Sequence, residues 1–304
     1  MRLGVLDVGS NTIHLQVVDA HRGARPTPAS SYKVELRLTE YLEEGAISPV
    51  GISLLFNAIE GAVAHAATVN TEEILAFATS ALREASNGDA IISEINRSFD
   101  IDLHILSGDE EARLTFLAVR RWLGWSAGKL LVLDIGGGSL EMAAGEDEEP
   151  EVAFSLPLGA GRLTRDFLSG DPYSSKSIRA LENYVAETLN NNIPETLKHH
   201  NAQHFVATSK TFRTLARVAN FWYEDSPKFL EQNSMLGIVS RLSSMTNSLR
   251  AGLPGVSSTR ARQIVAGAVV ARSAMDIFNI SELEICPWAL REGVILRWLD
   301  WMEN

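Results

Sequence analysis

Residues 132–141 read VLDIGGGSLE, and this segment gives the clearest indication of how the chain folds. An apolar run ends in Asp134, three glycines and a serine follow, and a second apolar run carries Glu141. The pattern predicts two strands joined by a tight turn, because glycine tolerates positive φ and lets a ligand approach the main chain. Successive N–H groups in such a turn form a concave site for an anion. An ordinary hairpin needs one or two glycines, so three glycines between paired acids favour a phosphate-binding turn.

The carboxylates that flank this turn are negative, so they do not bind phosphate directly. Asp134 and Glu141 fit the turn if a divalent cation lies between them and a phosphate, because hard cations take oxygen ligands. Asp7 is a third candidate ligand. The alternative for Asp7 or Asp134 is that the side chain caps its own turn. We favour the metal site.

The same phrase occurs at the start of the chain. Residues 5–9 read VLDVG and residues 132–136 read VLDIG. Each copy leads into a polar turn and a further apolar strand. A repeat at this spacing is not a solenoid period. It predicts two similar domains, each opening with a hairpin whose turn faces a shared cleft.

Length and composition are those of a globular protein with two domains. The chain has 304 residues, of which 45% are hydrophobic and 21% charged. We place the domains at residues 1–124 and 125–304, with the last helix, about 289–304, packing back toward the first domain. We expect no membrane-spanning run and no signal peptide, and therefore a cytoplasmic protein. Cys286 is the only cysteine, which we read as a small core residue.

The net charge of −11 argues against nucleic acid or a membrane as partner. The same field repels a polyanionic substrate. A site for such a substrate must therefore be locally basic or assisted by a metal.

Periodicity and turn residues predict an α/β chain. Strands are expected at residues 3–10, 12–20, 32–38, 73–79, 101–106, 129–134, 139–144, 152–156, 203–207 and 282–285. Helices are expected at residues 52–69, 89–99 (capped by Asp89), 110–122, 175–199 (broken at Pro194), 235–249, 259–278 and 289–302, with another from the 208–210 turn to residue 219.

Two adjacent acids open a helix directly after a strand. Glu110 and Glu111 are separated by about 100° around the helix, so they cannot both face one cleft. One of them is a candidate general base toward water, and the other complements the helix dipole. These observations do not say which. Arg83 and Arg113 are candidate phosphate ligands, with a surface or interdomain salt bridge as the alternative for each.

Polar or glycine-rich turns at strand ends supply candidate phosphate donors, because ligands bind at strand ends in such folds. The hairpin turns contribute Ser10, Asn11, Gly137, Gly138 and Ser139. Residues 158–162 and 208–211 are candidates for two more cradles. The seven histidines show no spacing typical of metal ligands.

Six motifs occur together in one order: DVGSNT, SALRE, SGDEEARL, DIGGGSLE, PLGAGRLT and ALREGVIL. In this the chain resembles the short, two-domain members of the Ppx/GppA family of exopolyphosphatases and guanosine pentaphosphate phosphohydrolases. The resemblance implies two actin-like ATPase (ribonuclease H-like) domains with an interdomain cleft. It implies Mg²⁺-dependent release of terminal orthophosphate from linear polyphosphate, with Mn²⁺ as an alternative metal, K⁺ undecided, and a homodimer as one expected assembly.

The resemblance also implies roles for single residues. Glu111 matches the catalytic base, Asp134 and Glu141 match the acids around Mg²⁺, and Asp7 matches an acid near the site. Arg83 matches the arginine of a T-x-x-L-R segment, and Gly159 lies in the loop that closes the site. The phosphate loops correspond to Ser10, Asn11, Gly136, Gly137, Gly138 and Ser139.

Two positions depart from the family pattern. Leu140 stands where many members have threonine, and we expect little effect. Ser209-Lys210-Thr211 stands where many members read S-G-T, so Lys210 either adds a phosphate contact or narrows the loop. The alternatives to an exopolyphosphatase are a guanosine pentaphosphate (pppGpp) 5′-phosphohydrolase, a kinase or ATPase of the same fold, and an inactive polyphosphate-binding module.

Overall fold

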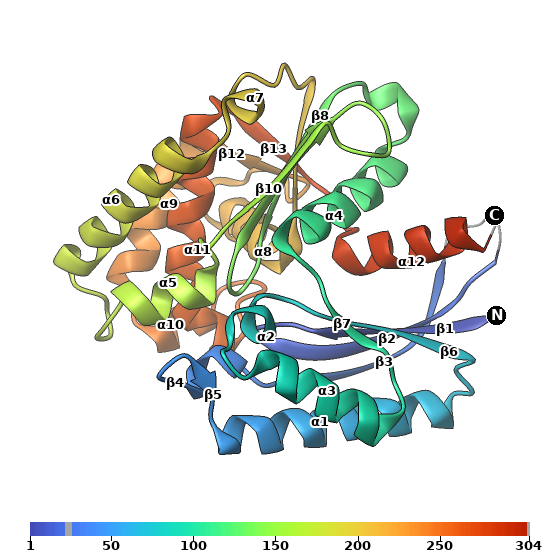
Figure 1. The fold of residues 1–304 in the computed structure, drawn as a ribbon. Coiled ribbons are helices and arrows are strands. Elements are labelled where there is room, and N and C mark those ends of the chain that lie inside the picture. Colours follow the sequence, from blue (N-terminus) through green and yellow to red (C-terminus); the bar gives the residue numbers. More distant parts are fainter. Residues whose placement is uncertain (22–25, 303–304) are drawn as a thin grey trace. The chain divides into compact units, whose positions relative to one another are not determined.

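The computed structural model describes residues 1–21 and 26–302 (Figure 1). The chain divides into two compact units. Unit 1 comprises Met1–Glu111 and Arg291–Asn304, and unit 2 comprises Ala112–Leu290.

Unit 1 is built on a five-stranded sheet with the order β3-β2-β1-β6-β7. The first three strands are antiparallel neighbours, and β6 and β7 continue the sheet in parallel with β1. The strands are β1 (Arg2–Val8), β2 (Thr12–Asp19), β3 (Thr27–Glu35), β6 (Glu73–Ala78) and β7 (Leu103–Ile105). A small hairpin lies apart from this sheet, formed by β4 (Leu42–Glu43) and β5 (Ala46–Ile47) after the 3₁₀ helix η1 (Leu38–Tyr41).

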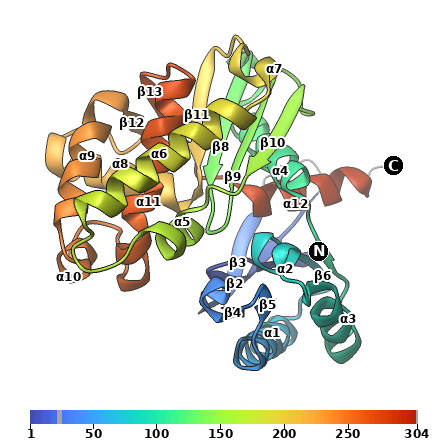
Figure 2. The same ribbon diagram turned by 60° about the vertical axis from the view of Figure 1, so that its left-hand side comes forward.

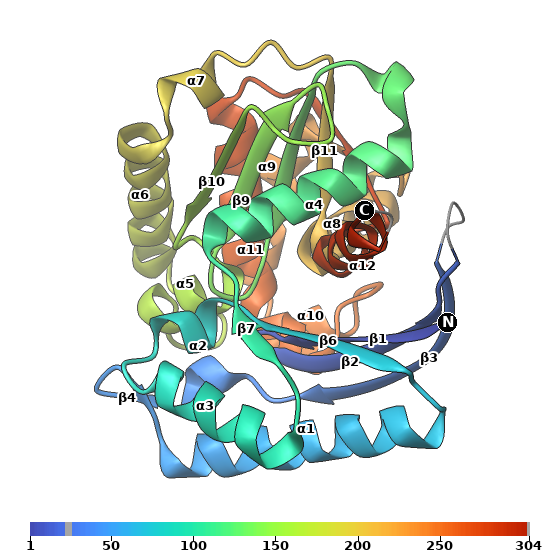
Figure 3. The ribbon, with the colours of Figure 1, turned by 45° about the vertical axis from the view of Figure 1, so that its right-hand side comes forward.

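Helices cover both faces of this sheet. Alternate residues of β1, such as Leu6 and Val8, point into a core shared with α1 (Pro49–Thr68), α2 (Ser80–Glu84) and α3 (Gly88–Phe99). The last helix, α12 (Leu290–Trp301), lies on the opposite face of the sheet from α1 and α3 (Figure 3).

Helix α1 differs from one expectation. By length and composition alone it is long and apolar enough to cross a membrane, so the expectation of no such run is wrong. Its Leu55 and Ile59 are nevertheless buried in the core of unit 1, and Glu60 lies on the exposed side. Ser48 caps the helix by accepting from Gly51 N, and Pro49 occupies the first turn. A core helix that packs on a sheet can have the same length and apolar composition as a membrane-spanning helix.

Unit 2 repeats the strand order of unit 1 and adds one edge strand. Its sheet has the order β10-β9-β8-β11-β13-β12. The strands are β8 (Leu130–Ile135), β9 (Leu140–Gly145), β10 (Val152–Leu156), β11 (His204–Thr208), β12 (Phe229–Glu231) and β13 (Glu282–Ile285). The repeated VLDVG and VLDIG phrases therefore mark two copies of one sheet, and the predicted α/β fold class with two similar domains is confirmed.

The central strand of unit 2 is buried on both faces, which explains its unbroken apolar run. Leu131, Leu133 and Ile135 pack on one face, and Leu130 and Val132 on the other. Figure 2 shows α6, α9 and α11 on one side of the sheet and α4 on the other. The helices are α4 (Gly108–Leu123), α5 (Ala160–Phe167), α6 (Ser175–Asn192), α7 (Glu195–Lys198), α8 (Ser209–Tyr223), α9 (Gln232–Ser244), α10 (Asn247–Ala251) and α11 (Ser258–Ile277), with the 3₁₀ turn η2 (Trp125–Ala127).

The division between the units corrects the predicted boundary at residue 124. It falls inside α4, between Glu111 and Ala112. Phe116 and Val119 of this helix pack with Val132 in the core of unit 2, so the helix beyond Glu111 belongs to that unit. An apolar helix face does not reveal in sequence which sheet it will cover.

Other differences are local. The helix expected at 235–249 is two helices, because Met245 is extended and Thr246 starts α10 by accepting from Leu249 N. The residue before α3 is Asn87 rather than Asp89, and it makes no side-chain cap. Strand β12 and the small β4–β5 hairpin were not predicted from the sequence.

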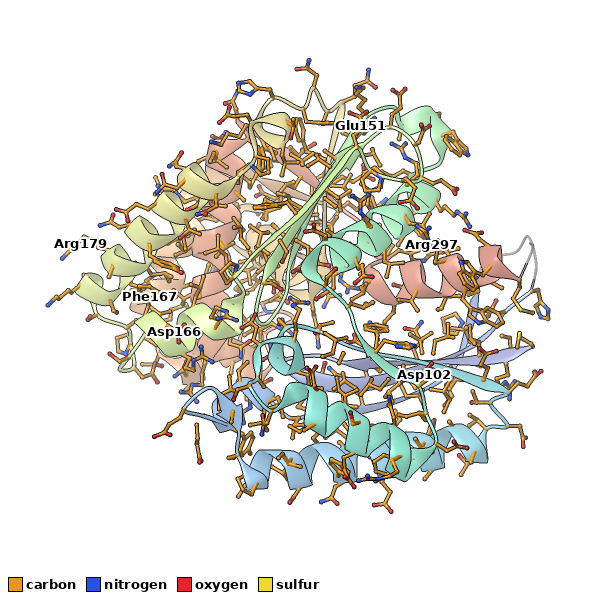
Figure 4. All side chains as sticks on the ribbon, viewed as in Figure 1. Asp102, Glu151, Asp166, Phe167, Arg179 and Arg297 are labelled. Carbon is orange, nitrogen blue, oxygen red and sulfur yellow. The ribbon has the colours of Figure 1, made fainter. Side chains whose placement is uncertain are left out.

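One histidine with unpartnered ring nitrogens predicts a pH dependence of stability. His200 follows α7, is half-buried, and has no hydrogen-bond partner for either ring nitrogen within the described chain. Burial lowers the pKa of His200, and Glu151 (labelled in Figure 4) opposes this shift. The unfolded chain therefore takes up this proton more readily than the folded chain, so the free energy of unfolding falls as the pH drops below the ordinary histidine pKa of about 6.5.

We expect the variant His200→Gln to lose less stability than wild type when the pH falls from 8 to 5.5. Urea unfolding midpoints at both pH values measure the difference. His199→Gln is the matched control. The neighbouring His199 side chain is exposed, so its replacement should leave the wild-type pH dependence of stability intact. An equal acid loss in His200→Gln and wild type would contradict this account.

Candidate functional site

The acid pair predicted from VLDIGGGSLE is formed within unit 2. Asp134 on β8 and Glu141 on β9 are direct cross-strand partners, so their side chains lie next to each other on one face of the sheet. Ser155 on β10 stands opposite Glu141 and donates its hydroxyl to Glu141 Oε1 at 3.0 Å. This bond holds one oxygen of the pair in a fixed direction.

The glycine turn between these strands is held through its carbonyl groups. Three successive carbonyls, those of Gly136, Gly137 and Gly138, accept hydrogen bonds from the start of α5. The donors are Ala160 N (3.0 Å to Gly136 O), Gly161 N and Arg162 N (2.9 and 3.0 Å to Gly137 O) and Arg162 Nε (2.9 Å to Gly138 O).

This arrangement sets the direction of the turn's amides. In a trans peptide the C=O and N–H groups point in opposite directions. Because three carbonyls point toward α5, the N–H groups of Gly137, Gly138 and Ser139 point away from it. Three successive amides so directed are suited to an anion, as the sequence predicted for this turn.

The predicted cradle at residues 158–162 has a different role. The amides of Ala160, Gly161 and Arg162 donate to the glycine turn, so the expectation that they receive a ligand is wrong. Gly159 packs against the same turn, and a Cβ atom there would lie 2.2 Å from Gly138 C and 2.3 Å from Ser139 N. Glycine is required here for space. Its role in phosphate binding stays a prediction.

The predicted cradle at residues 208–211 is also partly engaged. Thr208 Oγ1 donates to Trp288 O at 2.6 Å, and Thr211 Oγ1 donates to Ile135 O at 3.0 Å. These hydrogen bonds connect the start of α8 to Trp288 and to the end of β8. Ser209 has a φ of 72°, a left-handed conformation that costs a residue with a side chain more than glycine. Phosphate binding by Ser209 and Lys210 stays a prediction.

The first hairpin, in unit 1, repeats the geometry of the second. Gly9 N donates to Thr12 O at 3.0 Å, as Gly136 N donates to Ser139 O at 2.9 Å. The carbonyls of Ser10 and Asn11 accept from Leu38 N (2.8 Å) and Arg37 N (3.1 Å), in the segment after the third strand. The amides of Asn11 and Thr12 therefore point away from that segment.

One predicted phosphate ligand of this turn has a protein partner. The hydroxyl of Ser10 lies 2.7 Å from the hydroxyl of Ser80, and both side chains are buried. The pair joins the turn to the start of α2. Ser10 thus contributes to the shape of the turn, and any contact of its hydroxyl with phosphate stays a prediction.

The structure separates the roles of the two adjacent glutamates. Glu110 forms a capping box with Ser107, since Ser107 N donates to Glu110 Oε2 at 2.8 Å and Glu110 N donates to Ser107 Oγ at 3.2 Å. Hydrogen bonds from the backbone N–H and the hydroxyl of Ser107 lower the pKa of Glu110. Glu110 is therefore the residue that stabilises the helix end, which leaves Glu111 as the candidate base.

Glu111 is fixed by the predicted arginine. Arg83 at the end of α2 donates through Nη1 to Glu111 Oε1 and to Leu106 O, the latter at 2.6 Å. The Glu111 side chain is 9% exposed and that of Arg83 is 22% exposed. Arg113, the other arginine candidate, lies 4.0 Å from Glu149 and donates to Pro150 O. Its ion pair with Glu149 matches the salt bridge that the sequence offered as the alternative role.

Asp7 lies in a cluster that the sequence reading did not anticipate. It stands opposite His14 on β2, and Arg291 from α12 contacts both residues. Burial raises the pKa of Asp7 to about 6, Arg291 opposes this shift, and Glu292 adds to it. Arg291 belongs to the ALREGVIL motif. This motif pointed to Arg291, but the sequence alone did not indicate which residues the arginine would contact.

The acid pair of unit 2 fits Mg²⁺. Among residues 1–21 and 26–302 no group of three or more His, Cys, Asp or Glu side chains is arranged to hold a metal. Mg²⁺ usually binds through one or two carboxylates and completes its shell with water and substrate phosphates. Asp134 and Glu141 supply two carboxylates side by side, which matches this requirement.

Comparison with known proteins identifies the family of this chain. A family model described as the Ppx/GppA phosphatase family matches residues 17–302. Exopolyphosphatase 1 of Mycobacterium tuberculosis (strain H37Rv) is 49% identical over 305 residues, which cover 99% of this chain and 89% of the relative. Exopolyphosphatase 1 of Mycobacterium leprae is 48% identical, with 99% and 90% covered.

Solved structures share the fold. An exopolyphosphatase from Cytophaga hutchinsonii has a TM-score of 0.87 at 24% identity, over 99% of this chain and 98% of the other. The Aquifex aeolicus member of the Ppx/GppA family has a TM-score of 0.82 at 22% identity, over 100% and 99%. With a family model that spans nearly all of its length, this chain belongs to the Ppx/GppA phosphatase family.

Proposed function

We propose that this chain is an exopolyphosphatase, a hydrolase that releases terminal orthophosphate from linear inorganic polyphosphate with the help of Mg²⁺. The observation that carries the proposal is the glycine turn of unit 2, where three amides point away from α5 beside the Asp134–Glu141 pair. The relatives named Exopolyphosphatase 1, at 48–49% identity over nearly the whole chain, support the same activity.

The mechanism follows from the groups that each unit presents. Glu111 accepts a proton from a water molecule as the water oxygen attacks the terminal phosphorus. The bond from that phosphorus to the bridging oxygen breaks, which leaves orthophosphate and a chain shorter by one unit. Arg83 holds Glu111 and presents a guanidinium suited to phosphate oxygens. Positioning and electrostatic stabilisation then supply most of the rate enhancement.

The glycine turn binds substrate oxygens through the N–H groups of Gly137, Gly138 and Ser139. Asp134 and Glu141 would hold Mg²⁺, which offsets the negative charge of the phosphates when bound. A locally neutralised site is needed because the chain as a whole carries a net charge of −11. Cytoplasmic location, a homodimer and a role for K⁺ stay predictions.

Phosphate release tests the proposed activity directly. The purified chain should release orthophosphate from long-chain polyphosphate with Mg²⁺, at a kcat/KM above those for pppGpp and ATP. A higher kcat/KM for pppGpp would assign the chain to the second activity of the family. Phosphoryl transfer from ATP to an acceptor would indicate a kinase, and no release from any of the three would indicate a binding module.

Replacing the candidate base should slow the chemical step. We expect Glu111→Gln to lower kcat for polyphosphate by roughly 10²–10⁴-fold, because the amide cannot accept the proton of the attacking water. Polyphosphate binding, measured by calorimetry, should persist. Glu110→Gln is the matched control on the same helical turn, and it should keep kcat within about threefold because Glu110 only caps the helix. Near-wild-type turnover in Glu111→Gln would remove this residue from the role.

Filling the space at Gly159 should disturb the glycine turn. A methyl group there meets the backbone of Gly138 and Ser139, so we expect Gly159→Ala to lower kcat/KM by about 10²-fold, the scale of a small misplacement of binding groups. Gly252→Ala is the control, since a Cβ there meets only Leu249 O at 3.4 Å. Equal kinetics for the two variants would show that the close packing of α5 does not matter.

Metal removal should stop the reaction reversibly. Treatment with EDTA should abolish phosphate release, and added Mg²⁺ should restore it. Asp134→Asn should raise the Mg²⁺ concentration for half-maximal activity by at least about tenfold, because one of two carboxylate ligands is lost. The control is Asp166→Asn on α5, labelled in Figure 4, where the carboxylate pairs with exposed Arg165. A Mg²⁺ requirement unchanged by Asp134→Asn would exclude this site.

A further inference from the structure

The two copies of the repeated hairpin differ at one charged position. In unit 2, Asp134 stands opposite Glu141, and in unit 1 the corresponding Asp7 stands opposite His14. The backbone of the turn is the same, with Gly9 N bonded to Thr12 O and Gly136 N bonded to Ser139 O. The second acid of unit 2 is therefore an imidazole in unit 1.

In unit 1 a guanidinium contacts both members of the cross-strand pair. Arg291, in the first turn of α12, donates through Nη1 to His14 Nδ1, and its Nε lies 3.9 Å from Asp7 Oδ2. Its side chain is 21% exposed and that of Asp7 is 24% exposed. A guanidinium can only donate, so the ring nitrogen of His14 that faces Arg291 accepts the hydrogen bond and the imidazole is neutral in this contact.

This contact borders the turn that carries the candidate phosphate donors. A Cβ atom built on Gly9 would lie 3.4 Å from Asp7 Oδ1, so the carboxylate lies against the start of the turn. Arg291 thus links α12 to the first hairpin through Asp7 and His14, which lie on the two strands next to the turn.

The charges of the two copies differ as a result. Asp134 and Glu141 place two carboxylates side by side, which is a cradle for a divalent cation. Asp7 is faced by a guanidinium and a neutral imidazole, so a cation placed there would be repelled by Arg291. The same hairpin therefore favours a divalent cation in unit 2, whereas in unit 1 Arg291 offsets the charge of Asp7.

We propose that Arg291 is a positioning residue of the reaction: it orients Asp7 and His14 beside the first turn and keeps the divalent cation on the Asp134–Glu141 pair. This inference rests on the proposed exopolyphosphatase function. It differs from a purely structural role, in which Arg291 would serve only to attach α12 to the sheet.

The attachment of α12 provides a matched control. Farther along the same helix, Trp298 Nε1 donates to Glu73 Oε1 at 3.1 Å. The variant Trp298→Phe removes this bond and leaves the contact with Asp7 intact. It therefore reports what a loosened α12 does on its own.

Kinetics separate positioning from attachment. We expect Arg291→Gln to lower kcat for polyphosphate by about 10- to 100-fold while KM changes by less than about threefold, because a group that orients the site acts mainly in the transition state. Arg291→Lys should recover part of kcat by restoring the charge, and Trp298→Phe should keep kcat. Equal kcat values for Arg291→Gln and wild type would overturn the proposal. So would a loss of kcat in Arg291→Gln that Trp298→Phe reproduces at the same thermal midpoint.

Cation binding tests the second part without turnover. Calorimetric titration with Mn²⁺ alone should show that Asp134→Asn weakens binding at least tenfold, whereas Asp7→Asn leaves it within about threefold of wild type. Arg291→Gln should bind Mn²⁺ more tightly or take up a second ion, because Asp7 has lost its counter-charge. Equal weakening by Asp7→Asn and Asp134→Asn, or unchanged Mn²⁺ binding in Arg291→Gln, would overturn the proposal.

The two proposals fail separately. If wild type releases no phosphate from polyphosphate, the proposed function fails, while the Mn²⁺ titrations still decide where the cation binds. If wild type is active but Asp7 and Asp134 prove equivalent toward Mn²⁺, only the role of Arg291 is lost.

Discussion

Hydrogen bonds to the carbonyls of the two hairpin turns fix the orientation of the peptide groups in both candidate binding turns. In each unit the segment that follows the third strand donates amides to those carbonyls, from Ala160–Arg162 in unit 2 and from Arg37 and Leu38 in unit 1. A peptide group cannot turn its C=O one way without turning its N–H the other. The main chain therefore aims the amides of each turn, whatever side chains the turn carries.

This constraint explains how one piece of backbone serves two purposes. The strand order and the turn bonds are common to both units, while the residue opposite the first aspartate is Glu141 in one and His14 in the other. A change of one side chain on a sheet surface alters local charge without altering the ladder beneath it. The acidic copy is suited to a cation, and the copy with Arg291 is balanced.

Much of this was predictable from the sequence, because alternating apolar residues and glycine turns act locally. The two hairpins, the repeat and the cross-strand acid pair followed from residues 5–9 and 132–141 alone. Helical spacing did not separate the roles of Glu110 and Glu111; the family resemblance assigned the base to Glu111, and the capping box with Ser107 explains the role of Glu110. The direction of the α5 amides, the boundary inside α4 and the reach of Arg291 depend on tertiary contacts between distant segments, which no local pattern records.

The return of α12 to unit 1 has a consequence for biosynthesis. Arg291 follows 179 residues of unit 2, Ala112–Leu290, in the order in which the ribosome adds them. Domains generally fold as they emerge, the N-terminal one first. Here Arg291 is translated only after the whole of unit 2. During most of translation, Asp7 in the nascent first unit therefore lacks its counter-charge.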